Sequence, residues 1–398
     1  MRKYLPSFLV AALLCAHACA QVVINEIHYH PVERPAFNAV GDPIFQSTAT
    51  VADFSDDIHE FIELYNAGVA AVSLAGWRIE GGVDFTFPAG TSIAAGGYLV
   101  IGKNPARLQT VYGIAGVAGP FASKGTPLVQ TKLSNGSDTV RLVTPANVVI
   151  DSVSYDSKFP WAISANALGA DDDFTGLNSP AYQYKGRSLQ RVSATASSND
   201  PANWVAVRPV LGATTFADLP TPGAANIVTR AVPKPVVTGY SVVQTADNAT
   251  IIRATNTVKI TCSFSSTASL TNVQVEYFLD NMNAFGEART LLAMTALGNG
   301  QYTATLPGRA NRSIVRWRIK ADRGEGLELV APRADDPAVV QVGAPTYSAT
   351  PAAPNAVAKT PAPREAWYAY FVTPMLSSTK PIIDVIVPTD GTDRKSVV

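Results

Sequence analysis

Two strand-like segments near the start of the chain constrain its fold most: VVINEIHYHP at residues 22–31 and HEFIELYNAG at residues 59–68. Both alternate apolar and polar residues, which is the period of a half-buried β-strand. Each also carries a carboxylate within the strand pattern, Glu26 in the first and Glu63 in the second. Elsewhere Val, Ile, Thr, Tyr and Phe recur in short runs broken by Gly, Pro, Asn and Asp. This distribution predicts an all-β protein of sandwich type.

Three later segments continue the pattern: GWRI (76–79), FPAGTSIAAGGYLVIG (87–102) and LSNGSDTVRLV (133–143). Taken in order with the first two, they resemble the lamin-tail domain, an immunoglobulin-like β-sandwich that also occurs in secreted bacterial proteins. A tryptophan followed by TPGAAN (221–226) is similar to the end of many bacterial lamin-tail-like domains. The resemblance implies a fold for about half of the chain and supplies almost no chemistry.

Local patterns give further expectations within this region. Residues 36–57 lack periodicity and predict a surface loop, and 157–186 are polar and irregular. Residues 105–113 predict a short helix. Residues 139–143 and 148–156 predict a hairpin, because Pro145 and Asn147 suit the turn between them.

The second half of the chain predicts another sandwich. Its strand patterns are TVKITCSF (257–264), NVQVEYFL (272–279), QYTATLP (301–307) and SIVRWRIKAD (313–322). The dipeptide Asn299-Gly300 is a strong hairpin-turn signal. This sequence pattern resembles immunoglobulin-like and fibronectin-type-III-like modules of exported bacterial proteins.

The end of the chain carries two further patterns. KPIIDVIVPTD (380–390) resembles the first strand of a CotH-type, kinase-like domain, and DRKSVV (393–398) matches one reading frame of a sequencing adapter, which suggests a truncated gene. The expected boundaries are a signal peptide 1–20, a lamin-tail-like domain 21–227, a linker 228–235, a second sandwich 236–342, an Ala/Pro-rich linker 343–366, the start of a further domain 367–392, and an artefact 393–398.

The N-terminus has the pattern of a secretory signal. Arg2 and Lys3 precede the apolar stretch 5–14, and an A-x-A motif predicts cleavage between Ala20 and Gln21. The apolar stretch is too short for a membrane span, which needs about 20 residues. A lipoprotein signal at Cys15 or Cys19 is the alternative, although neither cysteine has the usual flanking residues.

The predicted location is therefore secreted, cell-surface or periplasmic, with no membrane span in the mature chain. Cys262 alone remains after cleavage, so an internal disulfide is excluded. Its strand-like context predicts core packing rather than a reactive thiol.

Charge argues against a nucleic-acid partner. The 31 basic and 31 acidic residues balance, and no basic stripe suits a phosphate backbone. The expected partner is an extracellular protein or a surface polymer.

Histidines near the first two strands form one metal candidate. His28 and His30 share a strand face, and His59 and Glu60 begin the next strand. Zinc requires three or four converging ligands. The competing interpretation, which we prefer, is a solvated edge of a sandwich.

A loop with Asp171, Asp172 and Asp173, near Asp156 and Asn178, is a calcium candidate. Calcium takes six to eight oxygen ligands from flexible acidic loops. The spacing does not match an EF-hand, and a solvated run of charges is the preferred interpretation. No other cofactor is expected.

Two further groups of residues have a possible chemical use. Glu26 and Glu63 form a carboxylate pair that acid–base catalysis could use, but in neighbouring strands they would more naturally accept hydrogen bonds from backbone or hydroxyl donors. Exposed aromatic side chains can stack on glycan rings, although aromatics more often plug the ends of a sandwich. The aromatic candidates are Tyr155, Trp161, Tyr182, Tyr184 and Trp204.

Nucleophile elbows, P-loops and dinucleotide-binding motifs are absent from the sequence. The sequence therefore predicts an exported, non-enzymatic module for attachment and protein–protein contact. The alternative is the targeting portion of a longer secreted enzyme with a CotH-type domain, and binding of calcium or glycan by loops is a further possibility.

Overall fold

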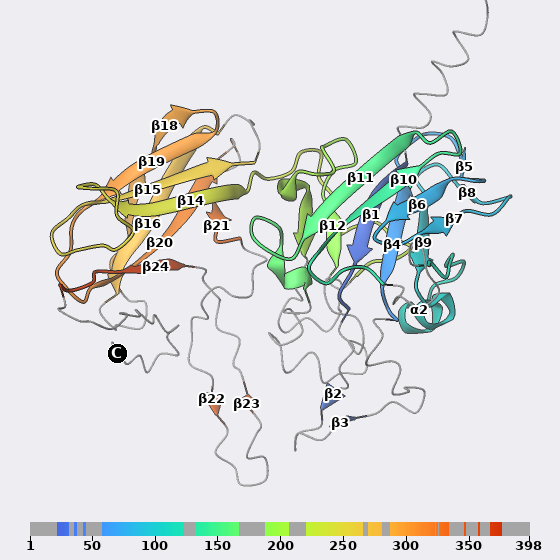
Figure 1. Ribbon diagram of the computed structural model, residues 1–398, viewed down its shortest axis with the longest axis horizontal. Coiled ribbons are helices and arrows are strands. Elements are labelled where there is room, and N and C mark those ends of the chain that lie inside the picture. Colours follow the sequence, from blue (N-terminus) through green and yellow to red (C-terminus); the bar gives the residue numbers. More distant parts are fainter. Residues whose placement is uncertain are drawn as a thin grey trace, which may run out of the picture. The chain divides into compact units, whose positions relative to one another are not determined.

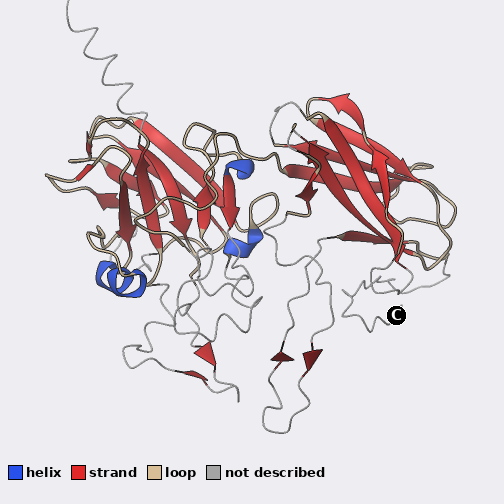
Figure 2. Cartoon of the chain, turned by 180° about the vertical axis from the view of Figure 1, so that it is seen from behind, coloured by secondary structure: helices blue, strands red, loops and turns tan. Residues whose placement is uncertain are grey.

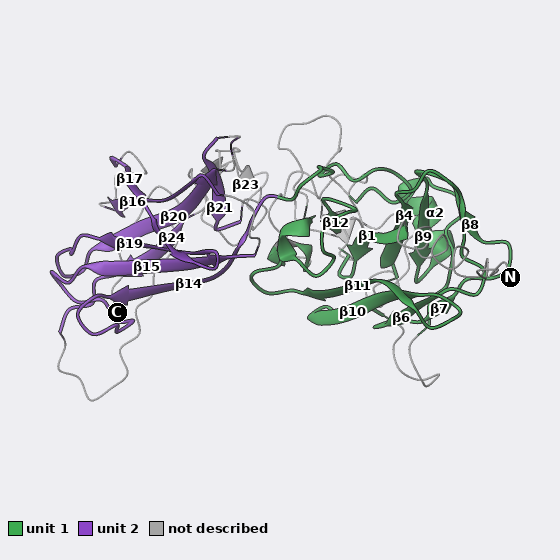
Figure 3. Ribbon diagram, turned by 90° about the horizontal axis from the view of Figure 1, so that it is seen from above, with its two compact units in different colours: residues 1–233 green, residues 234–398 purple. Residues whose placement is uncertain are grey.

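The computed structural model describes residues 22–31, 36–37, 43–44, 58–122, 132–166, 188–206, 220–265, 270–280, 287–322, 324, 326–333, 346–347, 357–358 and 367–375. The chain divides into two compact units, residues 1–233 and 234–398 (Figure 3). Each unit is a β-sandwich made of antiparallel sheets, as Figure 2 shows by the predominance of strands. The predicted all-β fold, an immunoglobulin-like sandwich followed by a second one, is confirmed.

The first unit packs two main sheets face to face (Figure 1). The first sheet has the order β13-β12-β1-β4-β9, and the second has the order β11-β10-β6-β7. The strands of the first sheet are β1 (Val22–His28), β4 (Phe61–Asn66), β9 (Tyr98–Gly102), β12 (Leu189–Arg191) and β13 (Trp204–Ala206). Those of the second are β6 (Arg78–Gly81), β7 (Phe85–Thr86), β10 (Ser137–Val143) and β11 (Val149–Asp156).

The main core lies between these two sheets. Strand alternation turns Ile62 and Leu64 of β4 into this core, and in β1 one extra residue between Ile24 and Glu26 puts Ile24 and Ile27 on the same face. The residues between them face the other way. That opposite face of the first sheet, here called the outer face, therefore carries Glu26, His28, Phe61 and Glu63.

A bulge in β1 sets the register of this face. Ile24 pairs with Leu64 and Glu26 pairs with Glu63, so Asn25 is the extra residue. A bulge redirects side chains locally. Here it leaves Glu26 and Glu63 as direct cross-strand neighbours, with Asn25 beside them.

A short helix covers one part of the outer face. The predicted helix is present as α2 (Pro105–Tyr112), with Asn104 as its N-cap and Gly113 in the left-handed region at its end. Its Leu108 packs with Phe61 and Val100 in a small separate cluster. The cap at Asn104, the proline in the first turn and the terminal glycine explain why a helix forms here.

The predicted hairpin between β10 and β11 is also present. Asn147 takes a positive φ of 62°, and the N–H of Thr144 bonds to the carbonyl of Val148. The remaining short pairs of this unit are β2 (Ala36–Phe37) with β3 (Pro43–Ile44), and β5 (Val72–Ser73) with β8 (Ser92–Ile93). Ile163–Ala165 and Pro201–Asn203 form 3-10 turns.

The second unit has one sheet of order β14-β15-β19-β18 and another of order β17-β16-β20-β21, in which β24 also pairs with β20. The strands are β14 (Val237–Gln244), β15 (Val258–Phe264), β16 (Asn272–Asp280), β17 (Thr290–Ala293), β18 (Thr295–Gly298), β19 (Gln301–Leu306), β20 (Ile314–Asp322), β21 (Glu328–Ala331) and β24 (Tyr368–Phe371). A separate pair joins β22 (Thr346–Tyr347) to β23 (Val357–Ala358).

Two expectations for this unit are met. Asn299 and Gly300 both take positive φ at the β18–β19 turn, at 51° and 73°. Cys262 is buried in the core, and burial raises the pKa of its thiol to about 12. A protonated, buried thiol packs as a small apolar group rather than reacting as a nucleophile.

One boundary differs from the expectation. Residues 367–392 were predicted to begin a further domain, but β24 pairs with β20 from Ile314↔Phe371 to Trp317↔Tyr368. Trp367 is buried, and the Arg318 guanidinium lies 4.0 Å from its ring centroid. The stretch 367–375 therefore belongs to the second sandwich, because its backbone completes one of that sandwich's sheets. The rest of the predicted segment lies outside the described residues.

Among the residues that the structure describes, no helix is long and apolar enough to cross a membrane. The predicted signal peptide, including Ala20 and Gln21, lies outside the described residues. So do KPIIDVIVPTD and DRKSVV at the end of the chain.

Candidate functional site

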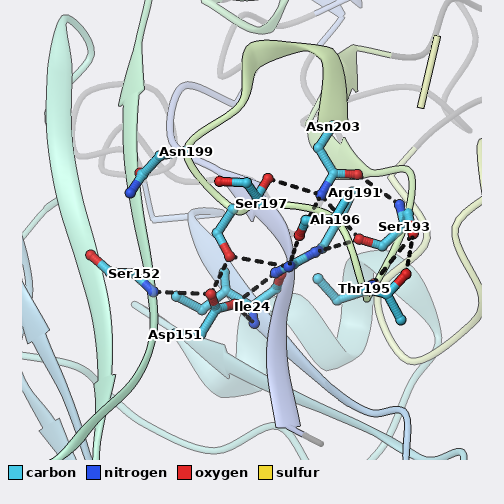
Figure 4. Close-up of polar contacts among 12 residues, drawn as sticks. Ile24, Asp151, Ser152, Arg191, Ser193, Thr195, Ala196, Ser197, Asn199 and Asn203 are labelled. Carbon is cyan, nitrogen blue, oxygen red and sulfur yellow. Dashed lines mark hydrogen bonds and ion pairs between the residues drawn. The ribbon is translucent and has the colours of Figure 1, made fainter. Parts of the chain in front are cut away.

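A buried ion pair links the two sheets of the first unit. Arg191 ends β12 in the first sheet, and Asp151 lies in β11 of the second. The Arg191 Nη1 and Asp151 Oδ2 atoms are 2.7 Å apart, and both side chains are less than a tenth exposed. Figure 4 shows the pair at the centre of a group of polar side chains and loop carbonyls.

Arg191 uses all five of its N–H donors inside the protein. A guanidinium offers five donors in a fixed planar arrangement, so complete pairing demands a matched set of acceptors. Its partners are Asp151 Oδ2, Ser198 Oγ and the backbone carbonyls of Ile24, Ser193 and Ala196. No donor is left for a ligand.

Both carboxylate oxygens of Asp151 likewise accept hydrogen bonds from groups inside the protein. Its Oδ2 also accepts from the N–H of Ile24 at 2.9 Å, and its Oδ1 accepts from Ser198 and from the N–H of Ser152. A buried charge is tolerated when it is paired and fully hydrogen-bonded. This pair therefore holds two sheets and one loop together.

That loop, residues 193–203, is folded onto the pair by Asn203. The Asn203 amide donates to the carbonyls of Ser193, Ala196 and Ser197, and its oxygen accepts from the Ser193 N–H at 2.8 Å (Figure 4). The neighbouring Trp204 is buried, and its indole N–H donates to the carbonyl of Ser198. The tryptophan that marks the end of the domain thus closes a structural loop.

The second polar group lies on the outer face of the first sheet, around Glu26. The Glu26 carboxylate is fully buried and accepts hydrogen bonds from Ser188 Oγ and Gln190 Nε2, both from the β12 region. Thr221 adds its N–H and its hydroxyl. Glu26 therefore joins β1, β12 and the segment 220–226.

Glu63 holds the same segment from the neighbouring strand. One of its oxygens accepts from the Asn25 amide at 2.8 Å, and the other accepts from the N–H of Gly223 at 2.5 Å. Gly223 has a φ of 84°, a conformation that suits glycine. Asn226 completes the closure by donating to the carbonyls of Asn25 and Arg191. The TPGAAN motif is thus anchored on the two carboxylates.

Burial changes the protonation of both carboxyl groups. It raises the pKa of Glu26 from 4.5 to about 7, although the bonds from Ser188 and Thr221 act in the opposite direction. Burial also raises the pKa of Glu63 well above its ordinary value, and the charge of Glu26 raises it further. Like charges directly opposite in a sheet repel, so the pair favours holding a proton at neutral pH.

These carboxylates have the structural role that the sequence favoured. They accept hydrogen bonds from backbone and side-chain donors, and these bonds hold the β12 region and the segment 220–226 against the sheet. Perturbed carboxyl groups also occur at catalytic sites. Here, however, the same oxygens that a catalyst would need already accept bonds from the segment 220–226.

The four side chains considered as metal ligands each contact different partners. His28 packs edge-on against Phe61, with ring centroids 5.3 Å apart, and burial lowers its pKa to about 3. His59 accepts from Arg107 Nε at 3.2 Å, Glu60 accepts from the Leu133 N–H, and His30 lies 2.6 Å from Asn166 Oδ1. Within the described residues, no group of three or more His, Cys, Asp or Glu side chains could hold a metal ion.

The solvated-edge interpretation of these residues needs correction. His28, His59 and Glu60 are all fully buried. Residues of α2 contact two of them: the Tyr112 hydroxyl lies 3.5 Å from His28 Nδ1, and Arg107 donates to His59. The helix that covers this part of the outer face could not be placed there from the strand pattern alone.

The aromatic candidates that the structure describes are buried. Trp161 and Trp204 lie 6.5 Å apart between ring centroids, and Tyr155 stacks on Tyr29 at 4.6 Å. All three belong to the main core. They plug the sandwich, as the packing interpretation predicts, and so present no stacking face for a glycan. Tyr182 and Tyr184 lie outside the described residues, as does the Asp171, Asp172 and Asp173 loop.

Sequence reasoning missed Asp151, Arg191, Asn203 and Asn226. Two of them carried a signal in the sequence. Asp151 interrupts the apolar run VVIDSV, and Arg191 is a charge two positions after Leu189, on the strand face that alternation turns to the core. Single charges in short strands are common on solvated faces, so only the fold identifies these as partners.

The fold and its internally bonded polar groups define the first unit as an immunoglobulin-like sandwich module. Residues 16–157 match the family model described as Lamin Tail Domain, which has this fold. The match spans a little more than a third of the chain. Both β12 and β13 lie beyond its end, although they complete the first sheet through Glu26↔Gln190 and Ile27↔Leu189.

Comparison with solved structures adds little. One described as "Crystal structure of Br derivative BhCBM56" is 14% identical, with a TM-score of 0.15, over 18% of this chain and 71% of its own. A pullulanase from Bacillus acidopullulyticus is 12% identical, with a TM-score of 0.18, over 69% of this chain and 34% of its own. At these scores neither likeness bears on fold or function. No curated protein matches the chain.

Proposed function

We propose that the chain is an exported, non-enzymatic protein whose sandwiches serve extracellular or cell-surface attachment through contact with a protein or a surface polymer. The signal-like N-terminus supports export. The Lamin Tail Domain match at residues 16–157 supports an interaction module. Balanced charge favours such a partner over nucleic acid.

One observation carries the non-enzymatic part of the proposal. Glu26 and Glu63 are the best acid–base candidates in the described chain, and both are buried beneath the segment 220–226 that they hold in place. A catalytic carboxylate must reach a substrate. Reaching Glu26 here would require removal of Thr221, which donates to it twice.

The test is expression of the full gene in its own cells, followed by analysis of the medium, the cell surface and the lysate. Export predicts an intact mass that begins at Gln21 outside the cytoplasm. An Ala20→Leu variant should retain the leader, because signal peptidase requires a small residue there. The purified protein should then bind saturably to whole cells. Full-length protein confined to the cytoplasm would contradict the proposal.

A second candidate function is the targeting portion of a longer secreted enzyme. It rests on the resemblance of residues 380–390 to the start of a CotH-type domain. Resequencing the locus past the codon for Asp390 tests it. A frame that continues into a long kinase-like sequence would support this candidate, and an early stop would remove it.

Calcium binding by Asp171, Asp172 and Asp173 is a specialised form of the first proposal. Calcium that binds the folded chain raises its melting temperature by mass action. A shift with calcium that disappears when the three aspartates become asparagines would support this site. An equal shift in both proteins would exclude it.

A further inference from the structure

The two sandwiches differ in how their sheet edges are protected. An edge strand presents unpaired N–H and C=O groups, which another chain can use for pairing. In the first unit, Ala118 bonds to both Val100 and Gly102 along the edge strand β9. Asn199 Oδ1 accepts from the N–H of Ser154 on the edge strand β11 at 2.7 Å.

The β17–β18 edge of the second unit lacks such a cover among the described residues. β17 ends one sheet and β18 ends the other, and the segment TLLAMTALG (290–298) runs through both. Of these nine residues, only Leu292 and Met294 are not exposed. Leu291 is 50% exposed and Leu297 is 57% exposed. The segment contains no charged residue and no proline, the usual means of blocking an edge.

The register shows which backbone groups of β17 are available. The N–H of Met294 bonds to the carbonyl of Val273 at 2.8 Å, and Leu292 faces Val275 in the same pairing with β16. Backbone groups alternate in direction along an antiparallel strand. The N–H and C=O groups of Leu291 and Ala293 therefore point away from β16.

From this geometry we propose that β17 is a self-association edge, on which a second copy of the chain pairs antiparallel about a two-fold axis at Leu292. In this register Leu291 lies opposite Ala293 of the second copy, and Ala293 lies opposite Leu291. Each of these two pairs exchanges both of its hydrogen bonds. The outward-facing N–H and C=O groups of Leu291 and Ala293 in one copy are thus hydrogen-bonded by the same groups of the second copy.

Charge favours a second copy as the occupant. Two-fold pairing brings each residue of β17 close to its own copy in the second chain, so any charge on this strand would repel itself. The strand Thr290–Ala293 carries no charge. The nearest charges in sequence, Arg289 and Glu287, precede the strand, and β18, which follows it, belongs to the other sheet. The contact is small, so the dimer should be weak. This inference holds whether or not the chain is exported.

The first experiment is sedimentation equilibrium of the full chain over a micromolar to millimolar series. Wild type should show a reversible monomer–dimer equilibrium. Leu291→Lys should weaken association at least about tenfold, because a lysine at an edge opposes pairing. Val148→Lys is the matched control, since Val148 is similarly exposed, at 55%, on the first unit. The melting temperature of each variant shows that it is folded.

The second experiment tests the register. Leu292→Cys places two thiols opposite each other at a position not hydrogen-bonded between the copies, where Cα atoms come close enough for a disulfide. In chains whose Cys15 and Cys19 are replaced by serine, mild oxidation should give covalent dimers faster with Leu292→Cys than with Val148→Cys or with no added cysteine, because Cys262 is buried. A wild-type monomer at all concentrations, unchanged association of Leu291→Lys, or no excess cross-linking of Leu292→Cys would overturn the proposal. The proposal would also be overturned if a strand of another protein were found paired with β17 while the chain itself stayed monomeric.

Discussion

Asp151 and Arg191 form an ion pair of 2.7 Å between the two sheets of the first sandwich, with no donor of the arginine left unused. The pair also fixes the loop 193–203 and the backbone of Ile24. It therefore ties residues from the start, the middle and the end of the first unit to one point. We expect this relationship to dominate the polar contribution to its stability.

Asp151→Ala should destabilise the first unit by about 3 to 5 kcal/mol, because it leaves a buried guanidinium without its counter-charge. Denaturant unfolding measures the change. Adding Arg191→Met to the same chain should recover much of the loss, since no uncompensated charge then remains.

The matched control is Glu80→Ala, which breaks the partly exposed Arg78–Glu80 pair. A solvated pair of this kind contributes about 1 kcal/mol or less. If Asp151→Ala cost no more than Glu80→Ala, the central role of the buried pair would be wrong.

Stability should also depend on pH through Glu26. Its pKa is raised from 4.5 to about 7 in the folded state, so between these values the folded chain holds a proton that the unfolded chain has released. The contribution of Glu26 to the free energy of unfolding should therefore fall as pH rises from 4.5 to 7, by at most about 1.4 kcal/mol per pH unit for one proton. His28, whose pKa is lowered from 6.5 to about 3, contributes a rise with pH over the lower part of this window, so the Glu26 contribution must be isolated by a variant. Urea titrations of wild type and Glu26→Gln at stepped pH measure this contribution as the difference between the two proteins.

Glu26→Gln should remove the Glu26 contribution, because glutamine does not titrate, so the advantage of wild type over the variant should shrink as pH rises. Glu63 lies opposite Glu26 and shares the effect, so the pair titrates as a unit and some slope should remain in the single variant. A stability difference between wild type and Glu26→Gln that stays constant, or moves in favour of wild type, as pH rises across the window would contradict the assignment.

Asn226→Ala should loosen the segment 220–226. The amide of Asn226 donates to the carbonyls of Asn25 and Arg191, and its loss leaves buried acceptors unpaired, at a cost of about 1 to 3 kcal/mol. Hydrogen exchange at Thr221 and Gly223 should become faster. Ser73→Ala, which removes an exposed and long hydrogen bond, serves as the control and should leave both amides unchanged.

Trp367→Ala tests whether residues 367–375 belong to the second sandwich. Trp367 is buried against Phe278 and the Arg318 guanidinium, so truncation should cost about 3 kcal/mol. Exchange protection of the β20 amides should fall. Met375→Ala, at a side chain 89% exposed, should have almost no effect. Unchanged protection in Trp367→Ala would favour the separate domain that the sequence suggested.

Local sequence signals were sufficient to predict the helix and the turns, but not which distant residues contact one another. Helix α2 follows from Asn104, Pro105 and Gly113, and the β18–β19 turn follows from Asn299 and Gly300, because caps and turns depend on neighbouring residues. The carboxylates of Glu26 and Glu63 were recognised as unusual within strands. Their shared closure by Thr221 and Gly223 was not predictable, since nearly 200 residues separate Glu26 from Thr221.

By itself, the sequence determined that this is an all-β protein with two sandwiches, since alternation and turn chemistry are local properties. Only the tertiary structure decided which side chains lie under the segment 220–226, that Asp151 meets Arg191, and that β24 joins the second sandwich. These outcomes depend on long-range pairing and on which face of a sheet is covered. A strand pattern specifies two faces, but the rest of the chain decides which of them meets water.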